Sequence, residues 1–123
     1  MESDITHPLE HVLLVSRIHA PEAADAPSDR LREGSGEARV WNCFSDPAGR
    51  FHVGHWQAEP GVIAVDYSET ELCVLIEGNA RLTDETGSVT FGPGEAFLIK
   101  PGFRGTWESI GRVTKIYAIL DAD

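Results

Sequence analysis

Short apolar runs, each closed by a turn that contains glycine or proline, follow one another from Val40 to the end of the chain, and this pattern constrains the fold most. Regularly spaced runs of this kind predict β-strands and are typical of a β-sandwich or a small barrel. Almost no stretch has the period of an amphipathic helix. We therefore predict an all-β protein with about nine strands after Val40, at residues 40–44, 51–56, 62–67, 71–76, 80–83, 88–91, 96–99, 105–107 and 113–120.

The first 38 residues have a different character and form a predicted N-terminal arm. Residues 12–15 read Val-Leu-Leu-Val, which is long enough for one strand. Residues 20–38 are rich in alanine, acidic residues, proline and glycine, so we expect a surface loop with at most one helical turn. A chain of 123 residues has the size of one domain. The predicted organisation is an arm over residues 1–38 and a β domain over residues 39–123.

The composition argues against several classes of function. Ten Lys and Arg residues against 20 Asp and Glu residues give a net charge of −10. Nonspecific binding of nucleic acids or anionic membranes requires clustered positive charge, so we predict neither as a partner. Cys43 and Cys73 lie far apart and outside any metal-binding or redox spacing. Because the N-terminal residues do not resemble a secretory signal, we expect a cytoplasmic protein.

Two spaced patterns between Pro60 and Tyr117 carry a resemblance to a known family. The matching residues are Glu71 and Gly78 in the first pattern, and Gly94 and Gly102 in the second, where Lys100 stands at the usual proline position with Pro101 beside it. Both patterns resemble the sequence motifs of the cupin superfamily. The resemblance implies a jelly-roll barrel, also called a double-stranded β-helix, in a single domain.

Longer phrases are similar to one branch of this superfamily. They are Trp56 with Pro60 and Gly61, followed in order by residues 71–78, 91–95, 102–108 and 115–117. The branch is named after (S)-ureidoglycine aminohydrolase. The resemblance implies a metal-dependent hydrolase of nitrogen catabolism that acts on carbon–nitrogen bonds, with manganese held by a glutamate, histidines and a glutamine.

The residues at the metal-ligand positions argue against a transition metal. The resemblance places Val65, Tyr67, Glu71 and Gly105 where metal-binding cupins hold the ion. Valine and glycine have no side-chain ligand atom, and a tyrosine with a pKa of about 10 rarely ligates. Only Glu71 is an ordinary ligand. We therefore predict that no metal cofactor is bound.

His52 and His55 offer the alternative, a site for Mn, Fe, Zn or Ni in which one of them joins Glu71. They are three positions apart, so in a regular strand they point to opposite faces and only one can face the barrel interior. A β-bulge at Gly54 would bring both to the same face.

Inward-facing residues define a predicted ligand pocket, because alternate residues of a strand share a face. Its predicted members are Val65, Tyr67, Glu71, Cys73, Gly105 and Trp107. In a functional interpretation Glu71 is a catalytic general acid or base, and Tyr67 donates a hydrogen bond to a small polar ligand. In a structural interpretation Glu71 only pairs with Tyr67, Lys115 or a backbone donor. Arg104 has the opposite parity and is expected at the rim.

Three functions remain open, and we favour the first. It is a cupin that binds a small polar molecule in the barrel without a transition metal. The second is the metal-dependent hydrolase that the resemblance implies. The third is a structural or partner-binding subunit whose barrel is closed. The resemblance also implies a homodimer, in which the N-terminal arm covers a sheet edge or crosses to the partner.

Overall fold

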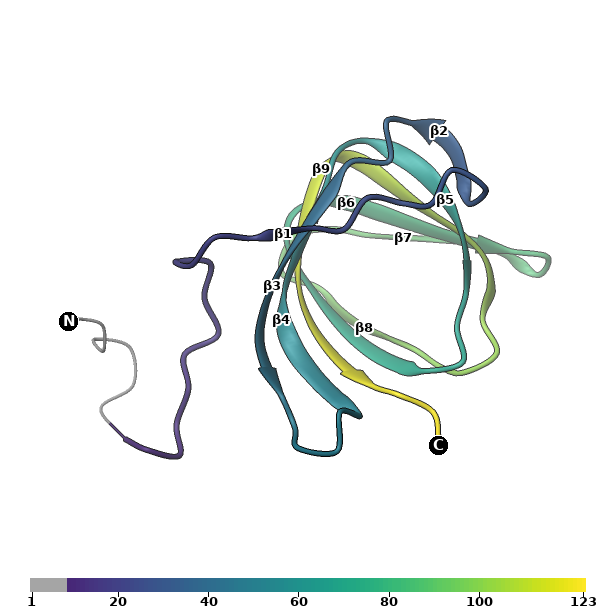
Figure 1. Cartoon of the computed structure of the whole chain (residues 1–123). Helices are drawn as coiled ribbons and strands as arrows, with labels where there is room; N and C mark the ends of the chain where they lie inside the picture. The colour runs from purple at the N-terminus through teal and green to yellow at the C-terminus, as the bar shows by residue number, and fades with distance from the viewer. Residues whose placement is uncertain (1–8) are drawn as a thin grey trace.

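The structure is a computed structural model that describes residues 9–123, so the first eight residues of the predicted arm lie outside the described residues. Within residues 9–123 the chain forms nine strands, all paired antiparallel, which curl into a barrel (Figure 1). The all-β jelly-roll prediction is confirmed. No helix long and apolar enough to span a membrane occurs in this range. The strands are β1 (Glu22–Ala23), β2 (Leu31–Gly34), β3 (Ala38–Ser45), β4 (Phe51–Ala58), β5 (Gly61–Asp66), β6 (Thr70–Asp84), β7 (Gly87–Phe91), β8 (Ala96–Ile99) and β9 (Arg104–Leu120).

Two long strands, β6 and β9, hold the barrel together. The first half of β9 pairs with β5 and its second half pairs with β4. Strand β6 pairs with β9 along most of its length and with β7 and β8 on its other edge. Each long strand therefore contributes to two sides of the barrel.

The structure joins strands that the sequence predicted as separate. Predicted strands at 71–76 and 80–83 are one strand, β6, and those at 105–107 and 113–120 are one strand, β9. Gly78 has a φ of 75°, and a Cβ atom there would lie 2.2 Å from the carbonyl oxygen of Arg112. A glycine is therefore required where the two strands approach closely, and it bends β6 without ending it.

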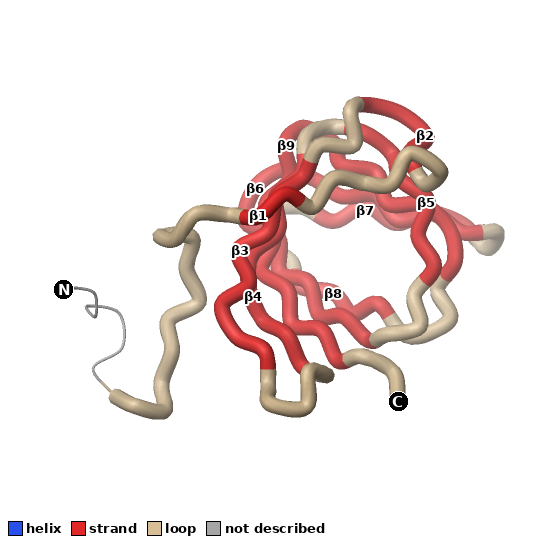
Figure 2. Tube along the Cα trace, viewed as in Figure 1, coloured by secondary structure: helices blue, strands red, loops and turns tan. Residues whose placement is uncertain are grey.

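The arm differs from its prediction. Residues 12–15 form no strand, contrary to the expectation, and run along the outside of β3 and β4 (Figure 2). Residues 20–38, predicted as a loop, contain β1, which pairs with β3, and β2, which pairs with β5. These strands of two and four residues are too short to show a periodic pattern. They lie at the two ends of the sheet order, where they cover the edges of β3 and β5.

A packed core fills one part of the barrel. Phe91 and Phe97 stack with ring centroids 4.1 Å apart, and Trp107 packs against Phe97. The buried members of this core are Cys73, Leu75, Ala80, Leu82, Phe97, Ile99, Trp107 and Val113. The remaining interior, between β4, β5, β6 and β9, is hollow and contains the candidate site.

Candidate functional site

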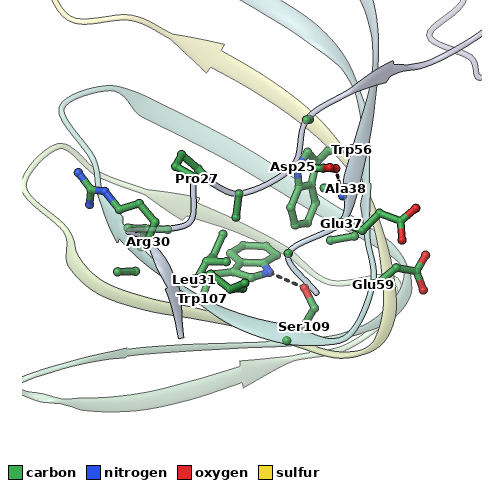
Figure 3. A pocket seen from close by; sticks show the side chains of 18 of the residues that line it. Asp25, Pro27, Arg30, Leu31, Glu37, Ala38, Trp56, Glu59, Trp107 and Ser109 are labelled. Atoms are coloured by element: carbon green, nitrogen blue, oxygen red, sulfur yellow. Dashed lines mark hydrogen bonds between the residues drawn. The ribbon is translucent and has the colours of Figure 1, made fainter. Parts of the chain in front are cut away.

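A cavity of about 400 Å³ lies inside the barrel, and we call it the Glu71 chamber. It is lined by Ala24, Val40, Asn42, His52, Trp56, Ile63, Val65, Tyr67, Glu71, Trp107, Lys115, Tyr117 and Ile119. A second cavity of about 300 Å³, the loop chamber, lies beneath residues 24–38 (Figure 3). The two share Ala24, Trp56, Ile63, Val65, Tyr67 and Trp107. They are therefore adjoining parts of one barrel interior.

A buried ion pair is the main polar feature of the Glu71 chamber. Lys115 Nζ donates to Glu71 Oε2 at 2.7 Å, and the two side chains are only 7% and 5% exposed. Lys115 lies on β9 directly opposite Leu75, whereas Glu71 is opposite Ile119. The long lysine side chain therefore reaches diagonally across the sheet to the carboxylate.

Two tryptophan rings enclose the ammonium of Lys115. Its Nζ lies 4.3 Å from the ring centroid of Trp107 and 4.7 Å from that of Trp56. The two rings meet edge to face with centroids 5.5 Å apart. Trp107 is itself oriented by a hydrogen bond from its Nε1 to Ser109 Oγ, at 3.0 Å (Figure 3). The ammonium is thus held by one carboxylate and by cation–π contacts, which are strongest where water is excluded.

The surroundings of the pair determine which groups are charged. Burial alone would raise the pKa of Glu71, but the Lys115 ammonium and hydrogen bonds from neighbouring groups outweigh it and keep the pKa below 4.5. Burial alone would lower the pKa of Lys115, and its anionic partner raises the pKa instead. Burial raises the pKa of Cys73 to about 12 and also raises the pKa of Tyr67. At neutral pH the site holds one carboxylate and one ammonium beside a neutral thiol and phenol.

Three further polar side chains of the chamber lining, those of His52, Tyr117 and Asn42, are hydrogen-bonded. His52 Nδ1 is 2.8 Å from Ser45 Oγ, and His52 Nε2 is 3.0 Å from Asp121 Oδ2. Tyr117 donates its hydroxyl to Asn42 Oδ1 at 2.7 Å. These contacts orient the three side chains and occupy both ring nitrogens of His52.

The structure brings most of the predicted pocket residues together. Val65, Tyr67, Glu71 and Trp107 line the Glu71 chamber. Cys73 lies behind the carboxylate, with Sγ 3.4 Å from Glu71 Oε2 and 3.7 Å from Lys115 Nζ. Gly105 is outside the lining residues.

Gly105 has no room for a ligating side chain. A Cβ atom at this position would lie 1.9 Å from the carbonyl oxygen of Thr83, on the neighbouring strand. Because real Cβ atoms do not approach backbone atoms so closely, glycine is required here by packing. The position that holds a histidine in the resembled motif is therefore filled by backbone.

Sequence reasoning placed too few residues of β9 and β4 in the pocket. Lys115 and Tyr117 line the chamber, although neither is among the predicted pocket residues. Both have the same parity as Trp107 along β9, so the period of two contained the signal. Trp56 was noted only as part of the family resemblance, and its parity with His52 would have placed the two on one face.

The two histidines on β4 point to opposite faces, as their spacing predicts. His52 lines the chamber, whereas His55 is buried on the outer face, with Nε2 3.3 Å from the carbonyl oxygen of Val15. No bulge on β4 brings them together. The register shift lies instead on β3, between Asn42 and Phe44.

The residues of the site do not fit a transition metal. Within residues 9–123 no three His, Cys, Asp or Glu side chains gather in a way that could hold an ion. Glu71 is the one ordinary ligand among the four motif positions, and its Oε2 already accepts from the Lys115 ammonium. A metal would need three or four converging ligands and would be repelled by that ammonium.

Comparison with known proteins places this barrel among the cupins. The EutQ-like cupin domain family matches residues 45–117, more than half of the chain. A protein of unknown function from Pseudomonas syringae pv. tomato is 28% identical with a TM-score of 0.75, over 87% of this chain and 47% of that one. The chain thus spans about half the length of this relative. A search of curated proteins found no match.

Two more distant structures share the fold. The EutQ protein of Clostridium difficile is 19% identical with a TM-score of 0.63, over 81% of this chain and 82% of that one. A predicted oxalate decarboxylase of Thermotoga maritima is 17% identical with a TM-score of 0.67, over 89% of this chain and all of that one (100%). At these identities the likeness concerns the fold alone.

Proposed function

Because the chain belongs to the EutQ-like cupin domain family, we propose that it binds a small molecule inside the barrel, in the Glu71 chamber, without a transition metal. The observation that carries this proposal is the ion pair between Lys115 Nζ and Glu71 Oε2 at 2.7 Å. In the resembled motif the glutamate faces a metal ion. Here a lysine of the same chain supplies the positive charge that the buried carboxylate needs, so the carboxylate is stable without an ion.

The shape of the barrel interior supports binding rather than a closed barrel. The Glu71 chamber of about 400 Å³ has the size of ordinary small-molecule sites. Its walls are largely apolar, and the few polar groups converge around Glu71. Glu71 is suited to accept a hydrogen bond, and Tyr67, whose pKa is raised by burial, is suited to donate one. A general-acid role for Glu71 is disfavoured, because its lowered pKa keeps it ionised at neutral pH.

Metal analysis separates this proposal from the metal-dependent hydrolase. The full chain, purified without chelator, would be measured for Mn, Fe, Zn and Ni beside the variant Glu71→Ala. We expect less than one-tenth of an equivalent of each metal in both proteins. A stoichiometric metal in the wild type that is lost in Glu71→Ala would contradict the proposal and support the hydrolase.

A ligand screen separates the proposal from the closed barrel. Small polar and aromatic molecules would be tested for a rise in melting temperature, and each hit would be titrated against the wild type and Tyr67→Phe. We expect weaker binding to Tyr67→Phe, because the chamber loses a donor. Hits that bind both proteins equally would place the site elsewhere.

We also propose that the chain forms a homodimer through its outer apolar surface. Leu72, Ile76 and Leu98, on the outward side of β6 and β8, are 42%, 40% and 55% exposed. The arm adds Val12, Leu13, Leu14 and Ile18, which are 44–71% exposed. Leu72 and Leu98 are direct cross-strand neighbours, and exposed apolar surface of this kind is typical of protein interfaces. Sedimentation at micromolar concentration should give twice the monomer mass, and Leu98→Glu should give the monomer. A monomeric wild type would contradict this proposal.

A further inference from the structure

We infer that the Glu71 chamber selects a neutral aromatic ligand with a hydrogen-bond donor, such as an aryl alcohol, over the matching carboxylate and the matching amine. The inference rests on the proposed binding function and names the chemical class of the ligand. Three independent features of the chamber support it: its charge balance, its aromatic walls and the capacity of the Glu71 carboxylate to accept a hydrogen bond from a ligand.

The charges of the chamber are balanced before any ligand enters. Glu71 and Lys115 compensate each other at 2.7 Å, and both side chains are more than nine-tenths buried. His52 also lines the chamber, and its partner is Asp121. A ligand carboxylate would meet the Glu71 carboxylate, and a ligand ammonium would meet the Lys115 ammonium. Either charge would lose its hydration without gaining a free counter-charge, which costs several kcal/mol per ion.

The walls favour an aromatic ring. Trp56 and Trp107 line both chambers, and Tyr67 and Tyr117 complete the aromatic lining of the Glu71 chamber. Lys115 belongs to the lining of the Glu71 chamber and not to that of the loop chamber. The tryptophans therefore also present surface that the ammonium does not cover. Aromatic pairs in offset or edge-to-face contact contribute about 0.5–1.5 kcal/mol beyond the burial of their area.

The carboxylate of Glu71 has one oxygen for a ligand donor. The hydrogen bonds from Lys115 Nζ and Cys73 Sγ both end on Oε2. A hydrogen bond with Tyr67 also contributes to the lowered pKa of Glu71, and Oε1, with its two lone pairs, can still accept from a donor in the chamber. A hydroxyl group carried by an aromatic ligand, as in benzyl alcohol, satisfies this acceptor without adding a net charge, and hydrogen bonds to a charged group are stronger than those between neutral groups.

The test uses three probes with one carbon skeleton: benzyl alcohol, benzoate and benzylammonium at pH 7. Dissociation constants would be measured by ligand-observed NMR titration against the wild type, Glu71→Gln and Glu108→Gln. Glu108 forms an ion pair with Arg81 at 3.2 Å and does not line the Glu71 chamber, so it is the matched control. We expect benzyl alcohol to bind the wild type and Glu108→Gln at least tenfold more tightly than the charged probes.

Glu71→Gln should favour benzoate, because the variant leaves the ammonium of Lys115 without a carboxylate. Benzoate should then bind at least tenfold more tightly than to the wild type. If Glu71→Gln does not fold, Lys115→Met provides the converse test: benzylammonium should bind more tightly than to the wild type, and this gain should grow as the pH rises, because the ligand displaces the proton that Glu71 takes up in the free variant. A charged probe that binds the wild type best, or an order unchanged in the folded variants, would overturn the inference and leave barrel binding intact. Absence of binding of all three probes to every folded protein would overturn the inference, whereas barrel binding itself is decided by the broader ligand screen described above.

Discussion

Replacing Lys115 with methionine tests directly whether the lysine stabilises the buried carboxylate of Glu71. Methionine keeps a flexible apolar side chain between Trp56 and Trp107 but removes the ammonium. Glu71, with a side chain that is 5% exposed, would then have no cation beside it. The least costly response is to take up a proton, so that no unpaired charge remains inside the barrel.

The loss of folding free energy caused by protonating Glu71 follows from the ordinary pKa of its carboxyl group. In the unfolded chain the pKa of Glu71 is 4.5, so holding the group neutral at pH 7 costs about 3.4 kcal/mol of folding free energy. This value lies within the range of about 3–5 kcal/mol that is typical of breaking a buried ion pair. We expect Lys115→Met to lose about this much stability at pH 7.

The pH dependence distinguishes this mechanism from a simple loss of packing. In Lys115→Met the pKa of Glu71 is raised in the folded state, so its contribution favours folding below 4.5 and is lost as the pH rises. The variant should therefore regain about 1.4 kcal/mol for each pH unit between pH 7 and pH 5. In the wild type the pKa of Glu71 is lowered in the folded state. Its contribution is present at neutral pH and is lost as the pH falls through 4.5 and below.

Urea unfolding at pH 7, 6 and 5, at one protein concentration, measures these differences. Lys100→Met is the matched control, since Lys100 lies exposed in a turn, and it should change the free energy of unfolding by less than about 0.5 kcal/mol. The double variant Glu71→Met/Lys115→Met should return to within about 2 kcal/mol of the wild type, because no charge remains to be paired. A loss below about 1 kcal/mol for Lys115→Met at pH 7, or a loss that is the same at pH 5, would refute the reasoning.

Three further predictions concern other parts of the chain. Burial lowers the pKa of His55 below 6.5, against the opposing effect of its hydrogen bond to Val15, so the packing of the arm over His55 should loosen as the pH falls below 6.5. Faster amide exchange of residues 15–17 would show this, and His55→Phe should abolish the dependence. Gly105→Ala should cost more than about 2 kcal/mol in urea unfolding, because its Cβ atom would strike the backbone of Thr83. Gly92→Ala, whose Cβ atom would meet its nearest neighbour at 3.6 Å, should cost less than half as much. Cys43 should react with a thiol reagent in the folded protein, whereas Cys73, which is fully buried and has a pKa of about 12, should react only after unfolding. Equal rates for the two cysteines would contradict the burial of Cys73.

The sequence by itself determined the class of fold and indicated that Glu71 lies inside the barrel. Strand formation after Val40 is a local property, since alternating apolar residues and turn-forming glycines and prolines act within a few positions. The spacing of Glu71 and Gly78 resembles a cupin motif, and this resemblance predicted that Glu71 faces the barrel interior. In contrast, β1, β2 and the unpaired course of residues 12–15 depend on whether a distant strand offers an edge, and this information is absent from the local pattern.

Only the tertiary structure decided which side chain pairs with Glu71 in the barrel. The sequence allowed Tyr67, Lys115 or a backbone donor as its partner, and it allowed a metal site with His52 or His55. The register of β6 against β9 sets Lys115 opposite Leu75, within diagonal reach of the carboxylate. The register of β4 against β9 sets Trp56 opposite Lys115, and the packing of Trp107 against Trp56 completes the enclosure. Contacts of this kind arise from long-range strand pairing, because side chains that meet across a barrel are separated in the chain by whole strands and turns.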